Sequence, residues 1–402
     1  MSDVRETGFK QRTRVADARE RLLDVDALDR TERVPLSVAD GRTLAEPIDA
    51  ARNVPHYPRA AMDGWAVRAE DTFGASDRSP AVLRPAESVG PNAAVRVHTG
   101  SELPDGADSV VMVEQTDEIA GELEVFDAVA EGENVAPVGE DVENDQRLYD
   151  PGHQLRPSDL GLLKATGIDT VEAVSHPEVA VVPTGEELVQ ADPEPGEVIE
   201  TNRFTVSRLA ERWGADVKRR NIVTDDHEAL RVAVERDLTR DVVVTTGGSS
   251  VGERDLIPEV VEELGEVFVH GVALKPGHPV ALGRVEDTTV VMLPGYPVAA
   301  IVNAVQFLRP LIKHLGRMPR NPIPTREAEL TRKIRSEPGV RTFVRVKLEG
   351  SDDELDATPT RASGSGVLSS VALADGWVVV EESREGIPKG ETVTVEDWEY
   401  NA

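Results

Sequence analysis

Apolar and polar positions divide the chain into regions of different character. Over residues 177–318, short runs of β-branched residues alternate with segments in which apolar residues recur at helical spacing, which predicts a doubly wound α/β domain. Its clearest strand covers residues 241–245 and runs directly into Gly247 and Gly248. We expect a buried central strand that ends in a glycine-rich loop, at the sheet edge where open α/β domains bind ligands. A tight structural turn is the alternative interpretation of this loop.

The regions outside residues 177–318 show shorter strands and more turns. Residues 51–148 contain frequent prolines between short apolar runs, which predicts an inserted small β-barrel-like or sandwich domain. Segments 12–50 and 149–176 are expected to form one discontinuous linker domain of extended strands and helices. Residues 319–402 begin with a proline-rich linker and continue as a predicted C-terminal β-domain. The sequence therefore predicts a multidomain α/β plus β protein.

Two helices are predicted in the linker domain. Apolar spacing places one over residues 14–26 and the other over residues 157–167. The second has Ser158 as a candidate N-cap and ends at Gly167. We expect these two helices to pack together, which would make the β-region an insertion between them.

The composition adds a strongly acidic surface and excludes several kinds of site. The chain has 74 acidic and 44 basic residues and a formal net charge of −30, which argues against non-specific binding to nucleic acid or anionic membranes. We interpret this charge as a salt-adapted surface. The absence of cysteine excludes disulfides, zinc–thiolate sites and iron–sulfur clusters. No apolar stretch approaches the roughly 20 residues of a membrane span, so we expect a cytoplasmic protein.

Acidic residues follow several predicted strands of the α/β domain. Glu187 comes after one strand, Asp225 and Asp226 precede a helix, and Asp255 follows the glycine-rich loop. If these loops meet at one sheet edge, their carboxylates surround a phosphate site only with a divalent cation between them, usually Mg²⁺. Taken singly, each acid is better explained as a solvated loop residue in a very acidic chain. Their occurrence at matching strand ends favours the metal site.

Further polar residues lie in turns. Lys275 occupies a Pro-Gly turn, and a lysine held in this way suits a phosphate or an oxyanion. His278 in the same turn is better interpreted as a turn residue, because an exposed imidazole is mostly neutral at pH 7. In the β-region, composition alone favours ordinary turns at Asp63 and at Thr99.

Eight motifs, taken in order, resemble the molybdopterin molybdenumtransferases, the metal-insertion enzymes of molybdenum cofactor synthesis. They are MDGWAV, HTGSELPDGADSVVM, ENVAPVGEDV, PTGEEL, TTGGSSVGERD, KPGHP, LPGYPVA and SGSGVLSS, and they extend over nearly the whole chain. The resemblance implies that adenylylated molybdopterin binds to the α/β domain. It further implies that molybdate is transferred to the dithiolene while Mg²⁺ supports release of AMP.

The same resemblance implies partners for the chain. The family forms a homodimer, with the site between the α/β domain of one protomer and the β-insertion of the other. Molybdopterin adenylyltransferase and molybdoenzyme targets are further candidate partners, and no nucleic acid or membrane is expected.

The resemblance also assigns roles to matching positions. Asp63 and Thr99 are expected to face the pterin ligand across the dimer, and Lys275 to lie near the oxyanion. The expected acids around the pyrophosphate are Glu187, Asp225, Asp226 and Asp255, of which Glu187 and Asp255 hold the metal. The other expected ligand-binding residues are Thr184, Gly185, Gly247, Gly248, Ser249, Ser250, Gly252, Pro294, Gly295, Arg341 and Ser365, the last two closing over the molybdate.

The chain departs from the family pattern at six positions in or next to these motifs. Ala60 replaces a serine, Trp65 a tyrosine, Ala136 an arginine, His278 a lysine, Tyr296 an asparagine and Ala299 a serine. The oxyanion end therefore has fewer fixed cations and hydroxyls. A tungstate-preferring paralogue and a molybdopterin-binding carrier or scaffold without turnover are the alternatives that follow. A molybdopterin adenylyltransferase or a generic nucleotide-binding α/β protein would leave the other domains unexplained.

Overall fold

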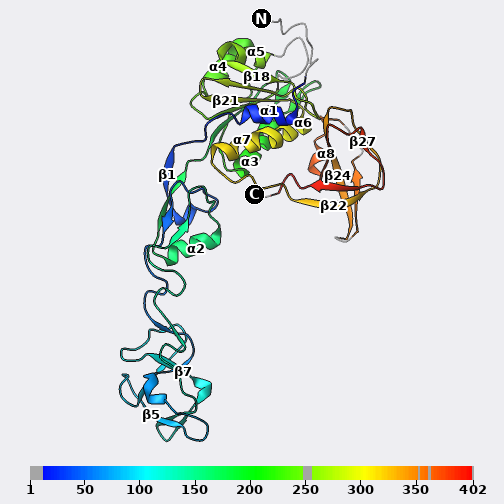
Figure 1. Ribbon diagram of the computed structural model, residues 1–402. Coiled ribbons are helices and arrows are strands. Elements are labelled where there is room, and N and C mark those ends of the chain that lie inside the picture. The colour runs from blue at the N-terminus through cyan, green and yellow to red at the C-terminus, as the bar shows by residue number, and fades with distance from the viewer. Residues whose placement is uncertain (1–11, 248–255, 352–353, 361–363, 401–402) are drawn as a thin grey trace. The chain divides into compact units, whose positions relative to one another are not determined.

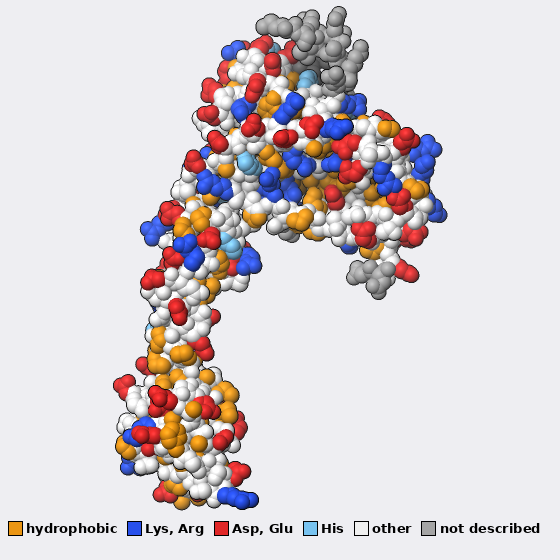
Figure 2. Space-filling view, in the orientation of Figure 1, with side chains coloured by type: hydrophobic (Ala, Val, Ile, Leu, Met, Phe, Trp, Pro, Cys, Tyr) orange, Lys and Arg blue, Asp and Glu red, His pale blue; other side chains and the backbone are white. Residues whose placement is uncertain are grey.

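The computed structural model forms two compact units. The described residues are 12–247, 256–351, 354–360 and 364–400. One unit comprises the residues up to Thr31 together with Val174–Ala402, and the other comprises Glu32–Ala173. Within the described part of the chain, no helix is both long and apolar enough to cross a membrane. Figure 2 shows acidic side chains scattered over the visible face of both units, with Lys and Arg among them.

A six-stranded sheet organises the first unit, as predicted (Figure 1). Its strands, in spatial order, are β16 (Asp216–Arg219), β13 (Glu178–Pro183), β17 (Val242–Thr246), β21 (Thr288–Leu293), β20 (Ala281–Val285) and β18 (Glu266–His270). The first four run parallel, β20 runs antiparallel to β21, and β18 runs antiparallel to β20. Every residue of β17 is buried, which confirms the predicted central strand.

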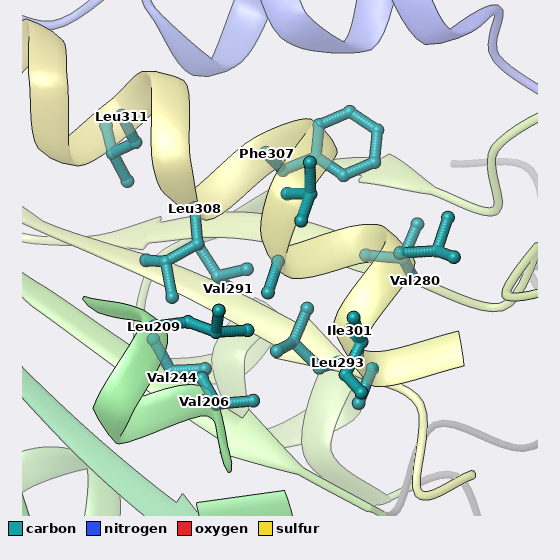
Figure 3. Packing of buried hydrophobic residues seen from close by; sticks show 14 of the residues in the cluster. Val206, Leu209, Val244, Val280, Val291, Leu293, Ile301, Phe307, Leu308 and Leu311 are labelled. Atoms are coloured by element: carbon teal, nitrogen blue, oxygen red, sulfur yellow. The ribbon is translucent and has the colours of Figure 1, made fainter. Parts of the chain in front are cut away.

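Helices cover both faces of this sheet, so the doubly wound prediction is confirmed. One face carries α3 (Asn202–Arg212) and a long helical segment made of α6 (Pro297–Asn303), a π-helical turn (Ala304–Leu308) and α7 (Arg309–Leu315). The other face carries α4 (His227–Glu235) and α5 (Leu256–Leu264). Alternate residues of the central strands enter the two hydrophobic clusters, as the pleat of a strand requires. Figure 3 shows Leu209 of α3 and Leu308 of the long segment packed near Val244 and Val291.

Helix α1 (Val15–Leu22) packs differently from the prediction. Its buried Val15, Ala18 and Leu22 belong to the hydrophobic cluster of the first unit, and not to a linker core with residues 157–167. Arg19 fixes the helix there by donating from Nη2 to Oε1 of Gln306 over 2.8 Å. The expected pairing of the two helices is therefore wrong, because the apolar stripe of α1 is buried in the core of the first unit.

Short strands make up most of the second unit, as predicted. The two linker segments meet through β1 (Thr31–Pro35) with β12 (Thr170–Val174) and β2 (Ile48–Asp49) with β11 (Arg147–Tyr149). Beyond them, β3 (Arg59–Ala60) pairs with β10 (Val135–Ala136). A six-stranded sheet follows, in the order β7 (Ser109–Met112), β4 (Gly64–Val67), β6 (Ala93–Val97), β5 (Ala81–Pro85), β9 (Glu122–Val125) and β8 (Thr116–Ile119).

Helix α2 (Pro157–Ala165) begins one residue earlier than its predicted cap. Pro157 occupies the first helical turn, so Arg156 is the N-cap and the prediction of Ser158 is wrong. The carboxylate of Asp159 accepts a hydrogen bond from the backbone N of Arg156 over 2.9 Å. Gly167 adopts a φ of +89° and follows the helix end, as predicted.

The C-terminal β-domain is a closed ring of five strands within the first unit. They are β22 (Thr325–Leu330), β24 (Arg341–Ser351), β25 (Glu354–Pro359), β26 (Gly376–Val380) and β28 (Thr392–Glu396), and each pairs with two others of the ring. Strand β19 (Leu274–Lys275) adds to β24 from the α/β domain. Smaller elements are β14 (Leu188–Val189), β15 (Val198–Ile199), β23 (Ile334–Arg335), β27 (Gly386–Ile387) and α8 (Ser369–Ala372). The pairing of β19 attaches the Pro-Gly turn to the barrel.

Candidate functional site

Three predicted ligand loops lie side by side at the carboxyl edge of the sheet. Thr184, after β13, donates its backbone N–H to the carbonyl of Thr246 over 3.1 Å. Gly247, after β17, donates in the same way to Leu293 over 3.1 Å. Pro294 and Gly295 follow β21 at this edge, and Pro294 is buried whereas Gly295 is exposed. The parallel strands therefore bring together loops that are far apart in the sequence.

Gly247 can be no other residue in this arrangement. Its φ is +119°, and a Cβ atom there would lie 2.0 Å from the carbonyl oxygen of Thr184. A Cβ atom on Gly295 would in turn lie 3.4 Å from Cα of Gly247. The loops thus form a surface of closely packed backbone that leaves no room for a side chain at Gly247, and phosphate groups can approach a surface of this kind closely.

The loop after β16 joins the same edge. Strand β16 ends at Arg219, and the chain continues beside β13 as far as Val223, whose backbone N donates to the carbonyl of Pro183 over 2.9 Å. Val223 forms a parallel bridge with Thr184 and accepts a hydrogen bond from the backbone N of Gly185 over 3.1 Å. This contact brings the predicted acids Asp225 and Asp226 toward the loop of Glu187.

The acids of these loops differ in structural role and in exposure. Asp226 is the N-cap of α4 and accepts a hydrogen bond from the backbone N of Ala229 over 3.0 Å, so its side chain has a structural use. Asp225 is half-buried, whereas the side chain of Glu187 is exposed. In the portion of the chain that the structure describes, no three His, Asp or Glu side chains gather as metal ligands.

The metal prediction depends on Glu187 and Asp255. Asp255 lies outside the described residues, as do Gly248, Ser249, Ser250 and Gly252. Mg²⁺ in phosphate sites is usually held by one or two carboxylates, with phosphate oxygens and water completing its coordination. An exposed carboxylate at an edge of bare backbone, such as Glu187, fits this kind of donor set.

The Pro-Gly turn is held by a buried side chain that sequence reasoning missed. Nδ2 of Asn303, a fully buried residue, donates to the carbonyls of Gly277 over 3.0 Å and of Ala299 over 2.8 Å. Gly277 has a φ of +110°, and a Cβ atom there would lie 2.1 Å from Nδ2 of Asn303. The sequence offers little signal for this role, because the same apolar run also contains Gln306.

The ionisable groups of this turn influence one another. Nζ of Lys275 lies 3.1 Å from Oε1 of Glu337, a residue that the sequence did not single out. Burial lowers the pKa of His278, and the nearby charges of Arg12 and Lys275 lower it further. The imidazole is therefore neutral at pH 7, in agreement with its interpretation as a turn residue.

The C-terminal barrel contributes Arg341 and Ser365. The guanidinium of Arg341 forms ion pairs with Glu381 and, over 3.4 Å, with Glu382. The carbonyl of Ser365 accepts a hydrogen bond from the backbone N of Val298 over 3.0 Å, which fixes the Ser-Gly loop to the start of α6. The barrel thus contacts the α/β domain through the Ser365 carbonyl and through the start of β24, where Arg341 lies.

Asp63 and Thr99 form a direct pair in the second unit. The carboxylate of Asp63 accepts hydrogen bonds from the backbone N of Thr99 over 2.6 Å and from its Oγ1 over 2.9 Å. These bonds lower the pKa of Asp63, the backbone bond more than the hydroxyl bond. Both residues are exposed, so the pair presents a fixed negative charge to solvent.

Three family models together match most of the chain. Residues 13–167 match the MoeA N-terminal region (domain I and II), and residues 180–314 match a probable molybdopterin binding domain. Residues 327–398 match the MoeA C-terminal region (domain IV). The three matched segments together contain the eight motifs that resemble the molybdopterin molybdenumtransferases.

Individual relatives match over almost their full length. The molybdopterin molybdenumtransferase of Haemophilus influenzae is 32% identical, with 92% of this chain and 94% of the relative covered. A Methanocaldococcus jannaschii protein whose name refers to molybdopterin biosynthesis is 35% identical, with 92% and 93% covered. The crystal structure of the molybdopterin biosynthesis MoeA protein from Pyrococcus horikoshii superposes with a TM-score of 0.83 at 34% identity, covering 97% of this chain and all of that one.

Proposed function

Because this chain belongs to the MoeA family of molybdopterin molybdenumtransferases, we propose that it inserts molybdate into adenylylated molybdopterin and releases AMP. It is a transferase of molybdenum cofactor synthesis, and the proposal concerns its substrates and its chemistry. In the proposed reaction, the anhydride bond between the adenylate and the pterin phosphate breaks. An oxygen from water or from the oxyanion joins the adenylate phosphorus, and the dithiolene sulfurs replace oxyanion oxygens that leave as water.

The bare backbone edge around Gly247 is the observation that carries this proposal. Cleavage of a phosphoanhydride needs positioning and charge neutralisation more than a nucleophilic side chain. An edge without side chains lets phosphate groups approach backbone N–H groups directly. Its packing against Thr184 and Gly295 leaves little freedom for other conformations.

Neutralisation of the phosphate charge is assigned to Mg²⁺. Glu187 and Asp255 would hold the ion, which would stabilise negative charge on the phosphate oxygens when bound. Asp226 serves as a helix cap first, so its replacement by Asn, which also caps helices, should preserve the fold better than replacement by Ala.

The oxyanion is assigned to the turn of Lys275 and to the barrel residues Arg341 and Ser365. The attachment of β19 to β24 supports a single site for these residues, because it ties the turn to the start of the barrel strand. We further propose a homodimer in which the Asp63–Thr99 pair of one protomer serves the ligand of its partner. Mixed dimers of Asp63→Ala and Lys275→Gln chains should then release AMP at molybdate concentrations at which neither variant does so alone.

Release of AMP from adenylylated molybdopterin tests the proposed function. The protein is incubated with Mg²⁺ in high salt, with molybdate, with tungstate and without an oxyanion. AMP that appears only with molybdate supports the proposal, and AMP that appears only with tungstate supports the tungstate-preferring paralogue. Tight binding of the pterin without AMP under any condition would contradict the proposal and favour a carrier.

A further inference from the structure

Both cations assigned to the oxyanion are already paired with carboxylates of the barrel. Lys275 contacts Glu337 over 3.1 Å, and Arg341 contacts Glu381 and Glu382. An incoming oxyanion must therefore share these cations with the protein's own acids or displace them.

The position of Glu337 is built into the fold. Glu337 and Val340 close a turn through a hydrogen bond of 3.2 Å from the backbone N of Val340, and Gly339 in this turn donates to the carbonyl of Glu382 over 2.7 Å. The next residue, Arg341, donates its backbone N–H to Ala273 over 2.9 Å. These bonds hold the turn beside β19, so that the short carboxylate side chain reaches Lys275.

The charge of Glu337 is stabilised by its surroundings. The hydrogen bond and charge of Lys275 lower the pKa of Glu337, and Arg12 and His278 act in the same direction. Glu337 is therefore ionised at neutral pH and presents a full negative charge beside Lys275. The two side chains are 64% and 60% exposed, so the pair is accessible and an oxyanion can replace the carboxylate without opening a buried contact.

We propose that Glu337 is a built-in competitor for the oxyanion at Lys275, and that it sets the oxyanion affinity of the site. This inference rests on the proposed function, because it concerns the same oxyanion. The competition is electrostatic and does not depend on the central atom of the oxyanion. Glu337 should therefore weaken the binding of molybdate, tungstate and sulfate to a similar degree.

Replacement of Glu337 by Gln tests this inference through binding, without turnover. Titration calorimetry of the full chain with molybdate, tungstate and sulfate should show apparent dissociation constants about two- to fivefold lower than in the unchanged protein, the range expected for one exposed ion pair. The gain should shrink at molar KCl, because salt screens exposed charges.

Two further variants make the test specific. Glu391→Gln is a matched control, because Glu391 pairs with Arg384 over 2.7 Å on the same barrel and the exchange removes the same charge. It should leave oxyanion binding unchanged. In a Lys275→Gln background, Glu337→Gln should bring no more than a slight gain, because the cation for which the two anions compete is absent.

Three results would overturn the inference. They are unchanged or weaker oxyanion binding by Glu337→Gln, an equal gain in Glu391→Gln, and a full gain without Lys275. Because binding is measured directly, each of these is separate from a failure of AMP release in the unchanged protein, which would contradict the proposed function instead.

Discussion

The two ends of the candidate site differ in the groups that they present, backbone at one end and charged side chains at the other. Around Gly247, the site consists of packed backbone at the end of a fully buried strand. A side chain at Gly247 would clash with the carbonyl of Thr184. Around Lys275, it offers exposed side-chain charges that are paired with acids of the barrel. The first end should tolerate almost no substitution, whereas the second can be retuned one charge at a time. The departures His278 and Ala299 lie at the second end, whereas Tyr296 lies next to Gly295 of the first.

The largest effect is expected for Gly247→Ala. The added Cβ atom would lie 2.0 Å from the carbonyl oxygen of Thr184, and the alanine would have to adopt a φ of +119°. We expect a loss of about 3 kcal/mol or more in the stability of the α/β domain, from overpacking and backbone strain together, and a loss of AMP release. Urea unfolding followed by circular dichroism measures the first, and an AMP assay the second.

Gly196→Ala is the matched control for this variant. Gly196 has a φ of +103° in the same domain, but a Cβ atom there meets nothing within 4 Å. It should cost only about 1–2 kcal/mol. Equal effects of the two substitutions would mean that the close approach to Thr184 is unimportant and would remove the proposed contrast between the two ends.

A smaller effect is expected for Asn303→Ala. The side chain is fully buried and bonds to Gly277 and Ala299, so its removal leaves buried carbonyls without a side-chain donor. We expect a loss of about 1–3 kcal/mol in unfolding free energy and weaker oxyanion binding through a looser turn.

Asn202→Ala provides the comparison at the other end of the site. Nδ2 of Asn202 donates to the carbonyl of Gly295 over 2.6 Å, but this contact is exposed and water can replace it. Its loss should cost about 0.5–1 kcal/mol. If urea unfolding showed a larger loss of stability for Asn202→Ala than for Asn303→Ala, burial would not determine how much these two amides contribute to stability.

The smallest effect is expected for His278, and it depends on pH. Burial and neighbouring cations lower its pKa in the folded protein below the ordinary value of 6.5. The neutral imidazole therefore favours folding above pH 6.5, and this contribution is lost as the pH falls from 6.5 through the lowered folded-state pKa. His278→Gln should lose less stability than the unchanged protein between pH 7 and pH 5 in parallel thermal scans. Identical pH profiles would show that His278 does not titrate in this way.

His278→Lys addresses the oxyanion directly. A lysine would restore a fixed charge at this position, although Arg12 and Lys275 would oppose it. We expect AMP release to reach half of its maximum at a molybdate concentration a few-fold lower. A higher molybdate requirement would show that the histidine does not occupy the position of the family's lysine.

The sequence predicted those features that depend on neighbouring residues. The strand before Gly247 and the end of α2 before Gly167, which has a φ of +89°, follow from local pattern and were placed correctly. The cap of α2 was misplaced by two residues, because Pro157 is itself favoured in the first helical turn.

Features that depend on tertiary contacts were missed. The packing of α1 on the long helical segment could not be inferred from its own apolar stripe, which fits any apolar face. Glu337 and Asn303 act across 62 and 26 residues of sequence, and no local pattern distinguishes them from other acids and amides. Within the site, the backbone end was therefore more predictable than the charged end.

One measurement tests the division between the two ends most directly. Binding of adenylylated molybdopterin and molybdate-dependent AMP release are compared in the unchanged protein and in Lys275→Gln, with calorimetry for the first and chromatography for the second. We expect Lys275→Gln to bind the pterin as the unchanged protein does but to need much more molybdate to release AMP. Loss of pterin binding in this variant, or AMP release with an unchanged molybdate requirement, would contradict the assignment of the oxyanion to the turn of Lys275.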